Sequence, residues 1–322
     1  MTPLWEDDFQ DQGATAGRWA PMTLGPFVPD DADIHVTPSE GLKVSARATH
    51  PVTGEPAFTN TLGQEDAPGA LPGALDAVKW LVYANVTTPG GLPGFEAPEE
   101  GELRFDALLS ARTYGTGGHP FGTAVEEPGA DFRLATAAMN AADVETGLAF
   151  DFFVTDRRIY AVHERLPMLR PHLGGYAAFT AVVPVGDREP GDTHRLTLAY
   201  DRSAGRVRWL VDGEERHRAE HLGRVPDRRF VVLDHGGEDT EVTPRQLNGG
   251  LGMFTALDCA SPDGGPALVR LTTADGLYRA TDGGGLPQVF LDDKSLPGNR
   301  LFGQGAALNV RRFTVSAVPA GR

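Results

Sequence analysis

Two carboxylic acids interrupt the apolar runs of LAFDFFVTDRRIYAVHERL, the stretch from residue 148 to residue 166. If this stretch folds as two β-strands about a two-residue turn at Asp156-Arg157, Asp151 and Glu164 become diagonal neighbours on adjacent strands. Diagonal neighbours on one face lie roughly 5.5–8 Å apart at Cβ. Repulsion between carboxyls at that separation moves their pKa values apart, so that one can act as an acid and the other as a base. The spacing therefore predicts a pair of acid–base residues.

The same turn assigns every residue of the hairpin to one face of the sheet, because strand side chains alternate. One face is the more apolar and is expected to pack in the interior, and it consists of Leu148, Phe150, Phe152, Val154, Ile159, Ala161 and His163. The other face carries the two acids and should line a groove, where Tyr160 would assist the chemistry and Phe153 and Arg158 would contact a ligand. The alternative is that Arg158 or Arg165 neutralises the acids and this face is merely the solvated side of the sheet.

Such a hairpin needs further strands, and the rest of the chain supplies them. Apolar runs that alternate and are rich in β-branched and aromatic residues recur between turns, while long helical periodicity is nearly absent. Gly (40 residues) and Pro (25 residues) punctuate the whole length, which suits many short strands joined by turns. We expect one strand at 132–138, followed by a turn at 140–143, and a long loop at 60–76. No linker divides the sequence, so residues 1–322 are expected to form a single all-β domain.

Three stretches carry a family resemblance. HRLTLAYDRSAGRVRWLVDG, residues 194–213, reads as a strand, a turn, a strand with Trp209, and an Asp-Gly pair of the kind that closes short hairpins. This pattern resembles the concanavalin-like jelly rolls, which include laminarinase-type glycoside hydrolases and laminin-G-like modules. The stretches EDDFQDQGATAGRW and EGLKVSA look like the first and second strands of that family. The resemblance implies a β-sandwich (jelly roll) of two antiparallel sheets with long loops. The whole chain also resembles a family of uncharacterised actinobacterial proteins with no assigned function.

The resemblance does not extend to the hydrolase machinery. Laminarinase-type hydrolases carry a Glu-x-Asp-x-Glu run on one strand, which supplies the separation of about 5–5.5 Å that a retaining carboxyl pair requires. The nearest stretch here is VETGLAFDF, in which Glu145 and Asp151 would lie roughly 20 Å apart on an extended strand. Glycoside hydrolysis by the family mechanism is therefore not expected.

Further polar candidates stand in loops and at strand ends. His119 lies at the tip of the Gly-rich loop YGTGGHPFGTAVEEP, which does not open a helix and is therefore not a phosphate cradle. His119 is either an acid–base residue at the groove edge or a turn histidine with a backbone partner. Asp234 could orient the imidazole of His235, and Gln246 enters the next strand. His235 and Gln246 are candidate ligand-binding residues.

Trp80 and Gln304 complete the ligand-binding candidates. Trp80, in VKWLVYANV, either stacks on a ligand or is a buried anchor, and Gln304 would project into the groove. No organic cofactor is expected, since the sequence has neither a dinucleotide fingerprint nor a Walker loop. The jelly rolls that the chain resembles commonly bind a structural Ca²⁺ on the convex side, and Asp8 is the candidate ligand for such an ion.

Charge and composition limit the partners. Lys and Arg number 29 against 44 Asp and Glu, which gives a formal charge of −15. A field of that sign repels phosphate backbones and anionic lipids, so neither nucleic acid nor a membrane is expected as a partner. Cys259 is the only cysteine, so no intrachain disulfide can form. The start MTPLWEDDFQDQ lacks the pattern of a secretory signal, and no stretch approaches 18 apolar residues, so a cytoplasmic location is expected. The sequence does not indicate the oligomeric state.

Three functions from different classes remain open. The first is a protein that binds a small, largely apolar metabolite in its groove, as a cofactor-free cyclase or isomerase of secondary metabolism. The second is a glycan-binding, lectin-like module, and the third is a structural or interaction protein whose sheet face covers a partner. Groove shape discriminates among them, because a closed pocket of about 300–1,000 Å³ favours the metabolite, an open cleft favours a glycan, and no cleft favours the interaction role.

Overall fold

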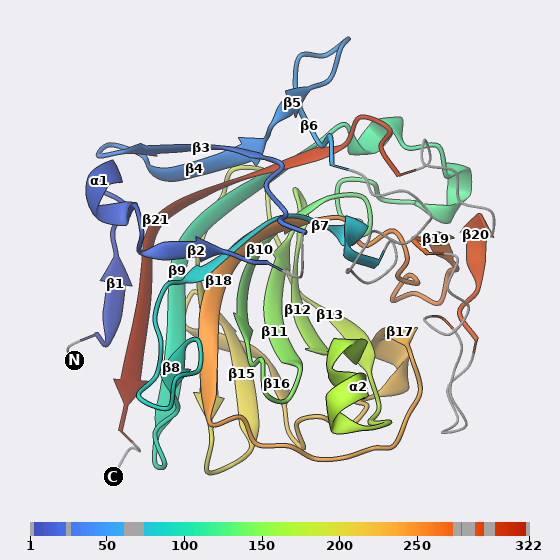
Figure 1. The fold of residues 1–322 in the computed structure, drawn as a ribbon. Helices are drawn as coiled ribbons and strands as arrows, with labels where there is room; N and C mark the ends of the chain where they lie inside the picture. Colours follow the sequence, from blue (N-terminus) through green and yellow to red (C-terminus); the bar gives the residue numbers. More distant parts are fainter. Residues whose placement is uncertain are drawn as a thin grey trace.

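The computed structural model describes residues 3–23, 27–60, 74–272, 278, 287–292 and 300–319. Within them the chain forms two large antiparallel sheets that stack on one another, with short helices only in the connections (Figure 1). The predicted all-β sandwich is confirmed. Of the loop expected at 60–76, residues 61–73 lie outside the described residues, and Ala74–Ala77 forms the 3₁₀-helix η1. No helix in the described ranges is long and apolar enough to cross a bilayer.

The first sheet has eight strands and contains the first and the last strand of the chain side by side. From edge to edge its order is β16 (Glu214–Ala219), β15 (Arg206–Val211), β14 (Thr193–Asp201), β9 (Glu102–Tyr114), β21 (Gly305–Val318), β4 (Gly41–Ala46) and β3 (Ala32–Thr37), with β1 (Trp5–Asp7) paired to β21. The Asp212-Gly213 turn between β15 and β16 has φ angles of 55° and 86°, as the predicted two-residue hairpin requires.

The second sheet has nine strands and carries the acid hairpin near its middle. Its order is β17 (Val231–Asp234), β13 (Phe179–Asp187), β12 (Arg158–Arg165), β11 (Leu148–Val154), β10 (Thr136–Ala142), β18 (Gln246–Phe254), β7 (Val78–Ala84) and β2 (Trp19–Pro21), with β8 (Phe95–Glu96) paired to β18. Because β11 and β12 are central strands, both acids stand on a rigid part of the molecule.

Short elements flank the two sheets. They are the pairs β5 (Ala48–Thr49) with β6 (Pro56–Ala57) and β19 (Ala267–Val269) with β20 (Phe290–Asp292), the helices α1 (Gln12–Thr15) and α2 (Arg170–Leu173), and the 3₁₀ turns η2 (Thr116–Gly118), η3 (Gly122–Ala124), η4 (Pro167–Leu169) and η5 (Arg228–Phe230). Figure 1 shows α2, β17, β19 and β20 gathered on one side of the molecule, away from β9 and β21.

The acid hairpin closes with the predicted register. Phe153 pairs with Tyr160, and the register places Asp151 opposite Val162 and Glu164 opposite Ala149. The backbone N–H of Thr155 donates to the carbonyl of Arg158 at 3.0 Å, which closes the turn at Asp156-Arg157. Asp151 and Glu164 are therefore diagonal neighbours on one face, as the spacing predicts.

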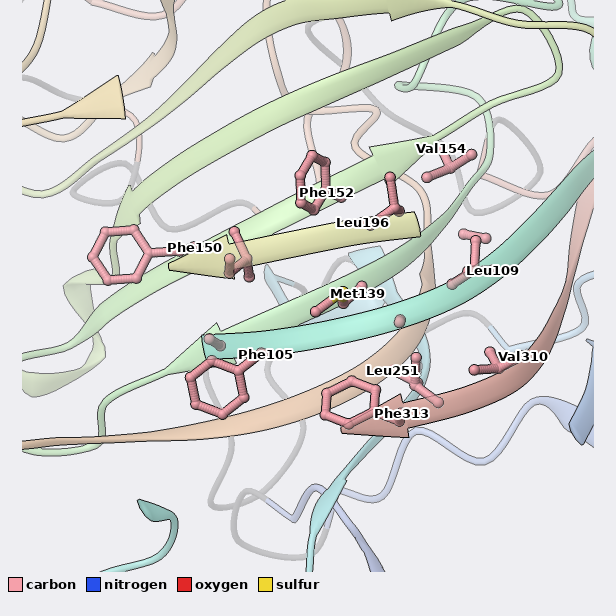
Figure 2. Packing of buried hydrophobic residues seen from close by; sticks show 14 of the residues in the cluster. Phe105, Leu109, Met139, Phe150, Phe152, Val154, Leu196, Leu251, Val310 and Phe313 are labelled. Carbon is pink, nitrogen blue, oxygen red and sulfur yellow. The ribbon is translucent and has the colours of Figure 1, made fainter. Parts of the chain in front are cut away.

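The apolar face of the hairpin packs between the two sheets. Figure 2 shows Phe150, Phe152 and Val154 of β11 among side chains of the opposing sheet, namely Phe105 and Leu109 of β9, Leu196 of β14, and Val310 and Phe313 of β21. All of them are almost fully buried. Because this face is committed to the core, the alternating face that bears the acids points away from the first sheet.

His163 is the polar member of the interior face. Its ring centroid lies 5.3 Å from that of Phe150 and 5.1 Å from that of Phe179. Neither ring nitrogen has a hydrogen-bond partner among the described residues. Burial, with a smaller contribution from His217, lowers the pKa of His163 to about 3, so the imidazole is neutral near pH 7.

The strand predicted at 132–138 is displaced in the structure, and this prediction is wrong in its boundaries. β10 runs from Thr136 to Ala142, and the turn begins at Asp143, whose carboxylate accepts the backbone N–H of Glu145 at 3.0 Å. The stretch lacks β-branched residues beyond Thr136, so its strand state comes from pairing with β11 on one side and β18 on the other. Asn140, expected in a turn, therefore lies within a buried strand.

Candidate functional site

A cavity of about 200 Å³ lies on the acid-bearing face of the nine-stranded sheet. Strand side chains form its floor, and the segments 75–78, 166–168, 233–235 and 254–259 contribute the rest of its lining. Apolar and aromatic side chains dominate the wall. Asp151, Glu164 and Asp258 all line it, and we call it the carboxyl cavity.

Asp151 and Glu164 line the same cavity, but the hydrogen bonding of their carboxyls differs. Asp151 is 4% exposed, and no hydrogen bond or ion pair reaches its carboxyl from any described residue. Glu164 is partly exposed, and its Oε1 accepts a hydrogen bond of 2.6 Å from the hydroxyl of Thr180 on the neighbouring strand β13. The ionised form of Glu164 thus has a donor that Asp151 lacks.

Burial and mutual repulsion separate the proton affinities of the two acids. Burial, together with the charge of Glu164, raises the pKa of Asp151 well above its usual range. Burial raises the pKa of Glu164 to about 7, while the Thr180 hydrogen bond opposes the rise and the charge of Asp258 adds to it. Both acids therefore hold their protons to a higher pH than ordinary carboxyls do, and Glu164 exchanges its proton near pH 7.

Neither arginine considered as a neutralising partner is bonded to the acids. Arg158 is paired with Glu127 and with Asp187, each at 3.4 Å. Arg165 donates to the carbonyl of Gly223 at 3.0 Å and to Thr240. Arg158, a candidate ligand-binding residue, is not among the residues that line the carboxyl cavity.

The aromatic candidates divide between the core and the cavity. Phe153 lines the cavity and stacks on Phe254 with ring centroids 5.7 Å apart. Trp80 is 4% exposed and packs in the core between the sheets, which is the buried-anchor alternative. The Tyr160 hydroxyl donates to the carbonyl of Ala130 at 2.7 Å, and Tyr160 is not part of the cavity lining.

His235 is the loop candidate that reaches the cavity, where it is buried. His119 is a turn histidine, since its Nδ1 accepts the backbone N–H of Phe121 at 3.1 Å, and it lies away from the cavity. Gln304 donates to the carbonyl of Arg300 at 3.0 Å and is also buried outside the cavity.

Gln246 belongs to a separate polar group. Its amide donates to Asp143 at 2.7 Å and to Glu145 at 2.8 Å. Glu145 is also paired with Arg245 at 2.6 Å, and none of these residues lines the carboxyl cavity. Glu145 and Asp151 therefore do not share a site, in agreement with the missing hydrolase pattern.

Asp8, the candidate calcium ligand, is an exposed residue that accepts the backbone N–H of Gln10 at 3.2 Å. Across the described ranges, no group of three or more His, Cys, Asp or Glu side chains could hold a metal ion. The expected Ca²⁺ site remains a prediction.

Besides Thr180 and Thr255, three polar residues of the cavity are absent from the sequence-based candidates. Tyr83 stands in the same run as Trp80 but on the opposite face of β7, so strand alternation could have found it. Burial raises the pKa of Tyr83, and the charges of Asp151 and Glu164 raise it further, because its phenol lies near both acids. Asp258, whose pKa burial raises to about 6, follows β18 in a loop, where no pattern marks it.

Asn140 is the third of these residues. It is 2% exposed and pairs across the ladder with Asp151 on one side and Gly250 on the other. A Cβ at Gly250 would collide with Asn140 Oδ1, so the glycine makes room for this amide. The displaced strand assignment hid Asn140 at the sequence level.

Fold and site together define a β-sandwich protein with two carboxyls of raised pKa in a mainly apolar cavity. The chain belongs to DUF6081, a family of unknown function whose model matches residues 6–319. An uncharacterized protein, L829, of Acanthamoeba polyphaga mimivirus is 25% identical over 41% of this chain, and the match spans 43% of that relative's length.

Among solved structures, the chain is similar to concanavalin-like jelly rolls. The catalytic domain of an endo-1,3-β-glucanase (laminarinase) from Thermotoga petrophila is 11% identical with a TM-score of 0.46, and the match covers 99% of this chain and 98% of that one. An endo-1,3-β-glucanase from Streptomyces sioyaensis is 13% identical with a TM-score of 0.45, over 98% and 95% of the two chains. Likeness at this level concerns the fold alone.

Proposed function

We propose that this protein binds a small, largely apolar metabolite in the carboxyl cavity and exchanges protons with it, as a cofactor-free cyclase or isomerase of the cytoplasm. One observation carries the proposal. Asp151 is a buried carboxyl without a partner among the described residues, and it stands diagonal to Glu164 inside an enclosed cavity. Burying such groups costs folding free energy. A ligand that binds to them would explain why the cavity contains them.

The two acids take complementary roles in this proposal. Asp151 holds a proton and donates it to one position of the ligand, while Glu164 is ionised in part and accepts a proton from another. The ligand gains one proton and loses one, so its composition is unchanged. A proton then passes from Glu164 back to the neighbouring Asp151, and both groups are reset for the next turnover. Thr180 fixes the direction, because its hydrogen bond favours the ionised form of Glu164.

The cavity limits the size of the ligand. An engineered apolar cavity of about 150 Å³ accepts benzene, so about 200 Å³ admits a ring with a short substituent. This volume is below the range of about 300–1,000 Å³ that is typical of drug-sized ligands. An oligosaccharide that crosses the sheet needs a longer cleft, so the small volume favours the metabolite over a glycan.

Native mass spectrometry of the purified protein tests the proposal, since a retained metabolite adds a discrete mass that organic solvent removes. The released molecule is then offered as substrate to the wild type and to the Asp151→Asn and Glu164→Gln variants. Both variants should keep the fold and lose turnover at least 100-fold, while Glu126→Gln, at an exposed site, should match the wild type. Undiminished turnover in both cavity variants, or a glycan as the retained molecule, contradicts the proposal.

A further inference from the structure

The carboxyl cavity contains more acidic groups than the proposed proton exchange uses. Asp258 lines the same cavity as Asp151 and Glu164, and it is 7% exposed. Its Oδ2 accepts a long hydrogen bond of 3.4 Å from the hydroxyl of Tyr278, a neutral group. Three carboxyls therefore share an enclosed volume of about 200 Å³.

The basic residues that line the cavity do not balance this charge. The guanidinium among the described lining residues belongs to Arg165. Its Nη1 donates to the carbonyls of Gly223 and Thr240, and its Cζ lies 4.1 Å from the ring centroid of Tyr176. His235 can supply at most one positive charge against three carboxyls. Arg300 lies outside the lining but acts electrostatically on Asp258, and the described lining still holds more carboxyls than basic groups. A cationic ligand would balance them.

Asn140 supplies an independent indication of the same kind. Its side chain lines the cavity, and no described residue makes a hydrogen bond to its amide. The amide oxygen is an acceptor, and a buried acceptor without a partner destabilises the fold. A ligand with several N–H donors would satisfy it together with the neighbouring carboxyls.

The wall of the cavity suits a cation as well. Phe153 and Phe254 stack on one another, and Tyr83 adds a further ring to the lining. Aromatic faces attract cations through the negative potential above the ring, and this attraction is stronger where water is excluded. The apolar wall and the acidic floor are thus compatible with one ligand that has an apolar body and a positively charged head.

We propose that the metabolite bound in the carboxyl cavity carries a protonated amine, held by Asp258 and Glu164 with Asn140 as a further acceptor. This inference rests on the proposed function and names the class of its ligand. The ammonium group supplies three donors and one positive charge, which matches the acceptors and the charge that the cavity leaves unbalanced.

Calorimetric titration with two probes of nearly equal shape tests this inference. Benzylammonium and benzyl alcohol share a ring and a one-carbon arm, and they differ in the charge and in the donors at the end. At pH 7.5 we expect benzylammonium to bind at least ten times more tightly than benzyl alcohol. Glu164→Gln and Asp258→Asn should each weaken benzylammonium at least fivefold and leave benzyl alcohol unchanged, while Asp33→Asn, at an exposed acid, should affect neither.

Proton release gives a second readout that an apolar cavity alone would not produce. Titrations at pH 6.5 in two buffers of different ionisation heat should show protons leaving the protein when benzylammonium binds, because the cation favours the ionised carboxyls. Benzyl alcohol should release none.

Equal affinity for the two probes, failure of benzylammonium to bind at millimolar concentration, or undiminished benzylammonium affinity in both Glu164→Gln and Asp258→Asn overturns the inference. None of these results touches the proposed function. That proposal fails separately, when Asp151→Asn and Glu164→Gln leave turnover of the retained molecule unchanged.

Discussion

The indole of Trp209 in β15 donates a hydrogen bond of 2.8 Å to the backbone carbonyl of Asp151 in β11, across the interior of the sandwich. Trp209 is fully buried, and its ring also packs edge-on against Phe150, with centroids 5.9 Å apart. One side chain of the first sheet thus fixes the strand of the second sheet that carries Asp151. The packing of the core and the position of Asp151 are physically linked through this contact.

Trp209→Phe should therefore destabilise the protein by about 2 kcal/mol, because it leaves the Asp151 carbonyl without its donor and opens a gap in the core. Urea unfolding followed by circular dichroism measures the change. Val52→Ala, at a side chain that is 87% exposed, is the control and should change the free energy of unfolding by less than about 0.5 kcal/mol. A loss of similar size in both variants would show that the contact contributes nothing.

Glu164→Gln should stabilise the protein in alkaline solution. The pKa of Glu164 is raised from 4.5 to about 7 on folding, so the folded state binds the extra proton between these values and the free energy of unfolding falls as pH rises through them. The full effect above pH 7 is up to about 3 kcal/mol. Comparing unfolding at pH 5 and pH 8, we expect the variant to gain on the wild type at pH 8, whereas Glu126→Gln gains at neither. A variant that is less stable than the wild type at pH 8 refutes the assignment.

His163→Phe should reduce the stability that the protein loses below pH 6.5. The pKa of His163 is lowered from 6.5 to about 3 on folding, so the unfolded state binds the extra proton in this window and stability falls as pH drops below 6.5. The effect reaches up to about 4 kcal/mol near pH 3. Thermal unfolding between pH 4 and pH 8 should show a flatter acid limb in the variant. His172→Phe, at an exposed position, should retain the slope of the wild type.

Thr180→Val should raise the pKa of Glu164 further, because the hydroxyl that donates to its ionised form is lost. Carbon-13 NMR titration of labelled glutamate carboxyls reads this pKa directly, and the pH profile of turnover should move upward with it. Thr255→Val, at another threonine of the cavity, is the matched control. An unchanged Glu164 titration in Thr180→Val would assign Thr180 a purely structural role.

The sequence predicts the hairpin well because two strong signals coincide there. Strand alternation separates an apolar face from an acidic one, and Asp156-Arg157 leaves one register in which the apolar face is continuous. The diagonal placement of Asp151 and Glu164 on one face follows from that register alone. Phe153 and His235 also line the cavity, and their role in ligand binding stays a prediction.

The remaining cavity residues could not be predicted from local patterns. The Ala-rich stretch around Asn140 has weak β-propensity, and only its two partner strands make it a strand. Asp258 reaches the cavity through the path of the loop after β18, which tertiary contacts determine. Polarity predicts Gln246 and Gln304 as ligand-binding residues, but the side chains of both make buried hydrogen bonds outside the cavity. Polarity alone cannot distinguish a binding residue from one that satisfies the backbone.

The alternation of side chains along β11 separates the positions that line the cavity from the positions that pack in the core. Neighbouring positions of one short strand serve separate tasks, since Phe150 and Phe152 pack between the sheets while Asp151 and Phe153 line the carboxyl cavity. A directed-evolution library restricted to Ala149, Asp151 and Phe153 of β11 and Glu164 of β12 would vary the cavity wall and leave the packed core of the sandwich unchanged.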